Sequence, residues 1–196
     1  MTFLKNYDNF KGIKMTLENT LLEVAQISIL NSFNSSFTID KQSLTKKFPL
    51  LLEKRASFVT LNLEGKLRGC VGSLVAHKDL LHDVIENAKK SAFSDPRFSQ
   101  LSYKEFQNIT IEISVLTPAV LLHYTNRADL KEKIKPFEHG IILQCENKQA
   151  TFLPQVWEQI PNFEDFFTHL SKKAGFETSC LDKHPTLYLY TATKIK

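Results

Sequence analysis

The stretch FVTLNLEGKLRGCVG, residues 58–72, decides how this chain folds and where its chemistry can lie. Residues 58–63 alternate apolar and polar side chains, which is typical of a half-buried β-strand. An acidic residue and a glycine then offer a tight turn, so residues 66–72 are predicted to return as the second strand of a hairpin. Because side chains alternate across a strand, we expect Arg68 and Cys70 to share one face.

This juxtaposition has a chemical consequence. A guanidinium close to a thiol favours the thiolate, which is the nucleophilic form of cysteine, so Arg68 would activate Cys70. Gly69 and Gly72 are costly inside a strand and indicate a bulge or a ligand that approaches the backbone closely. The alternative is that Cys70 is an inert packed residue, since free cysteines are among the most buried residues in proteins.

Composition places the chain among ordinary globular proteins. Its 196 residues are 42% hydrophobic and 23% charged, which suits one domain or a pair of lobes. Residues 1–14 show no periodicity and are predicted to be an N-terminal extension, with a single domain over residues 15–196. The net charge of +4 is small and the basic residues are scattered, so nucleic-acid binding is not expected.

The sequence also argues against membrane, secreted, metal-binding and nucleotide-binding proteins. No apolar stretch is long enough to span a bilayer and no secretory signal begins the sequence, so we expect a cytoplasmic protein without membrane attachment. The three cysteines form no CxxC pair, and neither a P-loop nor a GxGxxG motif is present. We therefore expect no metal, no cofactor and no structural disulfide.

The rest of the chain alternates helical and strand patterns without a regular βαβ repeat. This predicts an α+β fold with a mainly antiparallel or mixed sheet and flanking helices. Helices are predicted over residues 17–30, 40–47, 79–91, 126–134 or 129–134, and 163–174, and strands over residues 109–115, 140–145, 149–153 and 187–190. Thr16 and Asp79 can cap the first and third of these helices, and Ser102 and Glu105 have the spacing of a capping box for one short helical turn.

Two further polar segments could contribute to a site around Cys70. Asp95 and Arg97 flank a proline, and the pair either holds its own turn together or faces the thiol. Glu112 lies opposite the isoleucine face of its strand, so it is either exposed or buried against an arginine such as Arg68 or Arg97. The buried case would mark a site, because a buried carboxylate needs a partner.

Five motifs resemble the AMMECR family in that family's order, and the match runs from about Leu17 to Tyr190. In bacteria and archaea the family is known as protein A of the AmmeMemoRadiSam system. The motifs are LRGCVG at 67–72, AFSDPRF at 92–98, IEISVL at 111–116, FLPQVW at 152–157 and KAG at 173–175.

The resemblance implies a fold of two unequal lobes around a cleft that contains the LRGCVG motif. It also implies two partners, a Memo-type protein related to extradiol dioxygenases and a radical-SAM protein. It supplies no settled reaction. In residues 135–140, Phe137 stands where the family usually has glycine, which leaves the geometry of that loop and the role of His139 open.

Two functions of different classes follow from these observations. The first is an enzyme, or an enzyme component, that acts on a small anionic substrate. The second is a non-catalytic accessory or scaffold protein for the two implied partners. The residues assigned to the first function are Cys70, Arg68 and Glu112 as catalytic groups, and Gly69, Gly72, Asp95, Arg97 and Gln155 as binding groups.

Overall fold

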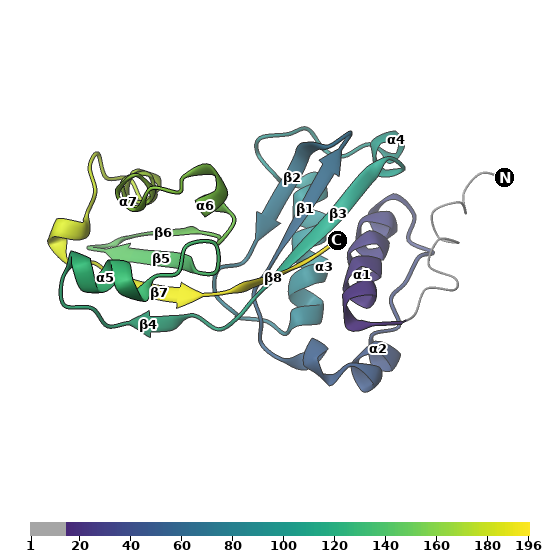
Figure 1. Ribbon diagram of the computed structural model, residues 1–196. Coiled ribbons are helices and arrows are strands. Elements are labelled where there is room, and N and C mark those ends of the chain that lie inside the picture. The colour runs from purple at the N-terminus through teal and green to yellow at the C-terminus, as the bar shows by residue number, and fades with distance from the viewer. Residues whose placement is uncertain (1–14) are drawn as a thin grey trace. The chain divides into compact units, whose positions relative to one another are not determined.

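The computed structural model describes residues 15–196, and the predicted extension 1–14 lies outside them. The chain divides into two compact units. The first runs to Val115 and also contains Lys194–Lys196, and the second is Leu116–Thr193. Each unit contains a four-stranded sheet with helices (Figure 1). The predicted α+β class is therefore confirmed.

The sheet of the first unit has the strand order β2-β1-β3-β8. The strands β1 and β2 form the predicted hairpin, and β1 also pairs antiparallel with β3. The short last strand was not predicted from the sequence. The bounds are β1 Ser57–Leu63, β2 Lys66–Gly72, β3 Ile109–Leu116 and β8 Ala192–Ile195.

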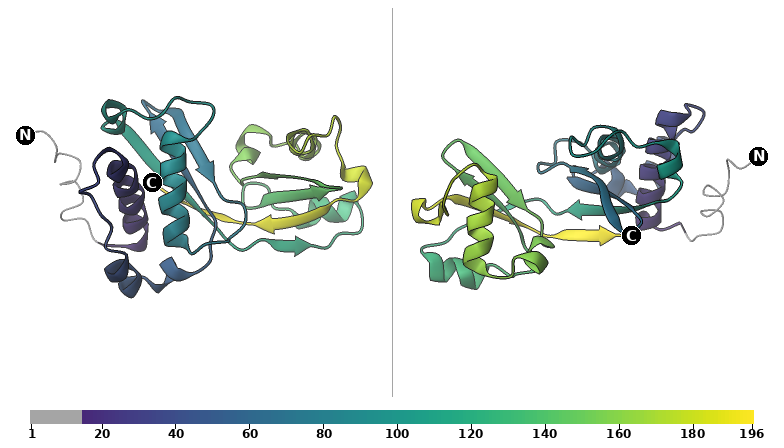
Figure 2. Two further views of the ribbon diagram at one scale, coloured as in Figure 1. Left: turned by 180° about the vertical axis from the view of Figure 1, so that it is seen from behind. Right: turned by 90° about the horizontal axis from the view of Figure 1, so that it is seen from above.

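Two helices, α1 (Leu17–Phe33) and α3 (Leu80–Phe93), cover one face of this sheet, as both views of Figure 2 show. Each begins where the sequence predicts, because the side chains of Thr16 and Asp79 accept N-terminal backbone N–H groups. Apolar residues of both helices pack with β1 and β3 in one core. Shorter helices complete the unit: α2 Lys41–Lys47, η2 Pro49–Leu52 and α4 Tyr103–Phe106.

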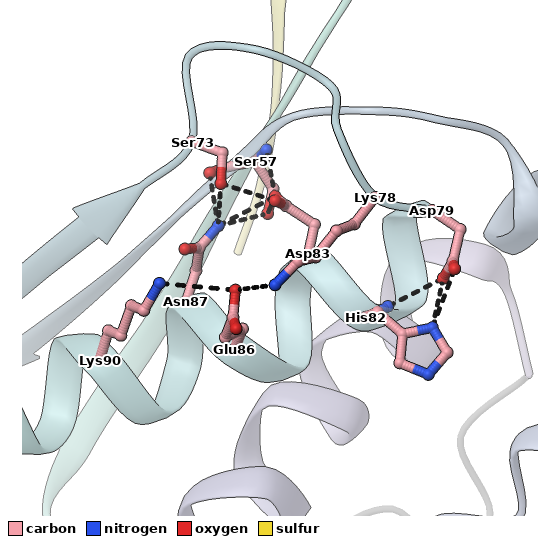
Figure 3. A network of polar contacts seen from close by, with 9 residues as sticks. All are labelled: Ser57, Ser73, Lys78, Asp79, His82, Asp83, Glu86, Asn87 and Lys90. Atoms are coloured by element: carbon pink, nitrogen blue, oxygen red, sulfur yellow. Dashed lines mark hydrogen bonds and ion pairs between the residues drawn. The ribbon is translucent and has the colours of Figure 1, made fainter.

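A buried carboxylate ties α3 to the hairpin (Figure 3). Asp83 is 3% exposed and accepts hydrogen bonds from the backbone N–H and the hydroxyl of Ser57, both at 2.7 Å. It also accepts from the hydroxyl of Ser73 at 2.6 Å and from the amide of Asn87 at 2.9 Å. These donors replace the water that a buried carboxylate would otherwise require.

The second unit contains an antiparallel sheet of order β4-β7-β5-β6. Its core is aromatic: Trp157 is fully buried and stacks on Phe166 with ring centroids 3.6 Å apart. The elements are β4 Val120–Leu122, α5 Arg127–Lys133, β5 Gly140–Cys145, β6 Lys148–Phe152, α6 Val156–Gln159, α7 Phe163–Lys173, η3 Leu181–Lys183 and β7 Thr186–Tyr190. None of the helices in residues 15–196 is both long enough and apolar enough to cross a membrane.

In the loop before β5, Phe137 has a backbone conformation that glycine usually adopts. The family resemblance leads us to expect glycine at this position. Phe137 has a φ of 69° and a side chain that is 59% exposed. A residue other than glycine is strained in this left-handed region, because its Cβ lies too close to the following carbonyl oxygen. The neighbouring His139 is held in place: its ring accepts from the N–H of Lys135 at 3.1 Å, and its carbonyl accepts from the indole of Trp157 at 2.9 Å.

We therefore expect Phe137→Gly to stabilise the protein by about 1 kcal/mol, because glycine removes the left-handed strain and little apolar burial is lost. Urea unfolding of the full chain measures this change. The adjacent Glu138→Gly, at a residue without a positive φ, should instead destabilise. A loss of stability in Phe137→Gly would show that the exposed ring has an unrecognised stabilising role.

Candidate functional site

A bulge in β2 changes how the LRGCVG motif is presented. Leu61 pairs with Gly69 and Asn62 pairs with Leu67, so Arg68 is an extra residue without a partner on β1. The extra residue interrupts the alternation of side chains. The expectation that Arg68 and Cys70 share one face by simple alternation is therefore wrong, although the glycine-marked strand does contain the predicted bulge.

The side chain of Arg68 turns into the protein instead. It is 8% exposed and binds Glu105 through two bonds, Nε to Oε1 at 2.9 Å and Nη2 to Oε2 at 3.2 Å. The same nitrogen Nη2 donates to the carbonyls of Ser99 at 3.0 Å and Gln100 at 3.3 Å. Arg68 thus fastens β2 to the segment that leads into α4, and its charge is neutralised there.

Glu105 both binds Arg68 and caps the helix α4. It completes the predicted capping box of α4, since it accepts the backbone N–H of Ser102 at 2.8 Å. Hydrogen bonding to Arg68, followed by the bonds from Ser102, lowers the pKa of Glu105 from 4.5 to about 2. The carboxylate is therefore charged throughout the physiological range, as the buried guanidinium requires.

The two glycines of the motif permit close packing. A Cβ on Gly69 would lie 2.2 Å from the carbonyl oxygen of Ser91 in α3, and a Cβ on Gly72 would lie equally close to the ring of Phe58. The hydroxyl of Ser91 accepts from the N–H of Val71 at 2.9 Å and donates to a carbonyl of β1 at 2.7 Å. These contacts account for both glycines without a ligand.

The backbone of Cys70 is held by the Asp-Pro-Arg turn. Its N–H donates to Asp95 Oδ2 at 2.9 Å, and its carbonyl accepts from Arg97 Nη2 at 3.1 Å. Asp95 and Arg97 also form an ion pair with each other at 2.7 Å. The pair therefore holds its own turn together and also binds the backbone of Cys70.

The ion pair shifts the pKa values of both of its members. Hydrogen bonding to Arg97 holds the pKa of Asp95 well below its usual range, despite the opposing effect of burial. The pKa of Arg97 is raised, first by the hydrogen bond to Asp95 and to a smaller extent by the side chain of Cys70. Arg97, whose side chain is 53% exposed, is thus the cation that binds Cys70, through the carbonyl of that residue.

The thiol of Cys70 lies on the face of the sheet opposite to α1 and α3. Cys70 pairs with Thr60, whose neighbours Val59 and Leu61 are fully buried in the helix-facing core. The hydroxyl of Thr60 donates to the sulfur at 3.3 Å. Cys70 itself is half-buried, so the residue combines a hydroxyl donor at its sulfur, a cation at its carbonyl and partial access.

Glu112 lies on the same face, but its partners are not arginines. It pairs with Thr60 across β1 and β3, and its carboxylate binds Lys194 at 2.7 Å and Lys196 at 3.4 Å. Burial raises the pKa of Glu112, but the two lysines more than offset this, so its pKa lies below the usual value. Glu112 is therefore half-buried, and lysines rather than the arginines of the buried alternative neutralise it.

The remaining candidates lie in the second unit. Gln155 is exposed at the start of α6, and its side chain makes no capping hydrogen bond. Burial lowers the pKa of His139, whose contacts are those described for its loop. Among residues 15–196, no three His, Cys, Asp or Glu side chains are grouped so that they could hold a metal ion.

These features define a class of protein: an α+β chain with two four-stranded sheets and a bulged, glycine-flanked Arg-Gly-Cys strand whose cysteine is clamped by an Asp-Pro-Arg turn. The AMMECR1 family model matches residues 22–195. The chain belongs to the AMMECR1 family.

Related proteins share most of the chain. It is 36% identical over 174 residues to Protein MK0488 of Methanopyrus kandleri, with 84% of this chain and 81% of the relative covered. A protein of Methanothermobacter thermautotrophicus is 31% identical over 180 residues, with 88% and 90% covered. The crystal structure of uncharacterized protein PH0010 from Pyrococcus horikoshii is similar with a TM-score of 0.78 and 30% identity, covering 89% of this chain and 88% of that one.

The Gly69–Ser91 contact yields a stability prediction. Gly69→Ala should destabilise the protein by about 2 kcal/mol or more, because the new methyl group meets a helix carbonyl that cannot rotate away. Thermal or urea unfolding measures the loss. Cys70→Ala, which keeps the strand backbone and changes only the opposite face, is the matched control. An equal loss in both variants would contradict the assigned contact.

The Arg68–Glu105 pair yields a pH prediction. The pKa of Glu105 is lower in the folded protein, so its contribution is fully present above pH 4.5 and is lost as the pH falls towards 2. Glu105→Gln leaves Arg68 buried without a counter-charge and should cost about 2 kcal/mol at pH 7.

The difference in urea midpoint between Glu105→Gln and wild type should narrow as the pH falls from about 4.5 towards 2. The exposed Glu53–Arg55 pair offers a control, because Glu53→Gln should cost less than about 1 kcal/mol. A Glu105→Gln loss that does not depend on pH would show that the ion pair contributes little.

Proposed function

We propose that this AMMECR1-family protein is a thiol-dependent enzyme, or an enzyme component, that uses Cys70 as a nucleophile on a small anionic substrate. One observation carries the proposal: the half-buried Cys70 directs its thiol away from the helices, and the guanidinium of Arg97 binds the carbonyl of the same residue. Within the motif, Arg68, Gly69 and Gly72 hold the strand. The thiol is left free for chemistry.

The roles within this site are revised accordingly. Arg97 takes the part that the sequence assigned to Arg68: it is the cation next to Cys70, and it can hold an anionic group with the exposed part of its side chain. Asp95 orients Arg97, and the Thr60 hydroxyl donates to the sulfur, which stabilises a negative charge there. A reduced thiol of this kind suits the cytoplasmic location expected from the sequence.

The second candidate is an accessory or scaffold protein for a Memo-type protein and a radical-SAM protein. It is favoured by the internal use of Arg68 and Asp95, which stabilise the fold rather than face a substrate. Glu112 is likewise neutralised by lysines. In this candidate the face around Cys70 is a contact surface, and the thiol has no reaction of its own.

Competing alkylation tests the two candidates. At pH 7, we expect iodoacetate to label Cys70 faster, relative to neutral iodoacetamide, than it labels Cys145 or Cys180, which are buried. Arg97→Gln should lower the Cys70 rate several-fold and abolish the preference for the anionic reagent, because it removes the cation and leaves Asp95 unpaired. Peptide mass spectrometry provides the rates.

Arg55→Gln is the matched control, because Arg55 is a surface arginine paired with a carboxylate in the same unit. Its Cys70 rate should equal that of wild type. A Cys70 thiol that is labelled only after unfolding would exclude the enzyme proposal. In that case, co-purification of the two expected partners with wild type and with Cys70→Ser would test the scaffold candidate.

A further inference from the structure

A groove of about 670 Å³ lies in the first unit, along the N-terminal half of α3. Its volume is within the range of small-molecule sites. It is separate from the residues that surround Cys70. Its lining comes from three segments, the end of η2 with the residues after it, the turn before α3, and α3 itself: Leu52, Lys54, His77, Lys78, Asp79, His82, Ile85, Glu86 and Lys89.

The carboxylates of the groove are already paired within the chain (Figure 3). Both oxygens of Asp79 accept from the Nδ1 of His82, at 2.8 and 2.9 Å. Glu86 binds Lys78 at 2.6 Å and Lys90 at 3.4 Å. Lysines outnumber carboxylates here, so the groove and its rim have an excess of positive charge.

The remaining cations belong to different elements. Lys54 makes no ion pair among residues 15–196, and Lys89 contacts only a neutral amide oxygen, that of Asn31, at 3.4 Å. At the rim, Lys41 of α2 approaches the Nε2 of His82 at 3.1 Å. Cations from three parts of the unit therefore surround one hollow, as an anion with several oxygens requires.

The backbone holds two of these lysines in fixed positions. Lys54 forms an isolated antiparallel bridge with Asp79. On either side of it, the N–H of Leu80 donates to the carbonyl of Glu53 at 2.9 Å, and the N–H of Arg55 donates to the carbonyl of Lys78 at 3.3 Å. The stems of Lys54 and Lys78 thus start from a common platform, which lowers the entropic cost of gathering their charges.

An apolar patch completes the groove. Leu52 is 60% exposed and Ile85 is half-buried, and both contribute to the lining. An inorganic anion would leave this patch uncovered. A ligand with an apolar or ring portion would cover it and gain hydrophobic free energy.

We propose that this groove is a binding site for a small organic phosphate. The phosphate oxygens lie between Lys54 and Lys89, and the apolar part of the ligand lies on Leu52 and Ile85. Lysine suits this role because it binds phosphate as a point charge and needs no planar geometry. The site is independent of the chemistry at Cys70.

Titration of the full chain with pyrophosphate and with adenosine diphosphate tests the proposal. Amide NMR shifts should map to the groove residues, and adenosine diphosphate should bind more tightly than pyrophosphate. The double variant Lys54→Gln, Lys89→Gln should have an affinity for both ligands that is lower by roughly fivefold or more. Added salt should also lower both affinities. Leu52→Ser should reduce only the advantage of adenosine diphosphate.

Lys104→Gln, on an exposed lysine of α4, is the matched control and should leave both affinities unchanged. Equal weakening in the control, or shifts scattered over all lysines, would overturn the site as unspecific charge attraction. Absence of saturation at millimolar concentration would overturn it as well. Equal affinity for the two ligands would overturn the organic part of the assignment.

Discussion

The first unit depends on the close approach of α3 to the edge strand β2. Gly69 has no side chain, so the carbonyl of Ser91 comes within the space that a Cβ would fill. At the same point the Ser91 hydroxyl bridges the N–H of Val71 and the carbonyl of Val59. Because helix and hairpin are joined by both packing and hydrogen bonds, the position of Cys70 on the opposite face is fixed by the interior of the protein.

The turn that follows α3 makes a second set of contacts with the same strand. An edge strand exposes unpaired N–H and C=O groups that invite association with other chains. Asp95 and Arg97 bind the backbone groups of Cys70, and thereby cover this part of the edge with side chains. The pair that covers the edge also places a cation next to Cys70, so the proposed chemistry would depend on the same two residues that protect the fold.

Local patterns were enough to predict most of the fold. The hairpin, the caps at Thr16 and Asp79 and the isoleucine strand depend on neighbours in sequence, and the structure confirms them. Arg68 was misplaced because one extra residue in β2 breaks the alternation, and no single-sequence pattern locates a bulge to one residue.

The partners of the site were harder to predict because they lie far away in the sequence. Glu112 binds lysines of β8 and of the last residue, and β8 itself is too short and too polar to be recognised. The ion pair between Glu105 and Arg68 was not predicted, because the capping box of α4 already accounted for a glutamate at position 105.

The path of the chain gives the protein an order of assembly. The second unit is inserted between β3 and β8. At its entrance and exit, the N–H of Thr117 donates to the carbonyl of Thr191, and the N–H of Thr191 donates to the hydroxyl of Thr117. Because synthesis runs from the N-terminus to the C-terminus, the second unit is made before the fourth strand of the first sheet and before the lysines that neutralise Glu112. The protein that begins synthesis with the first unit must therefore finish that unit last.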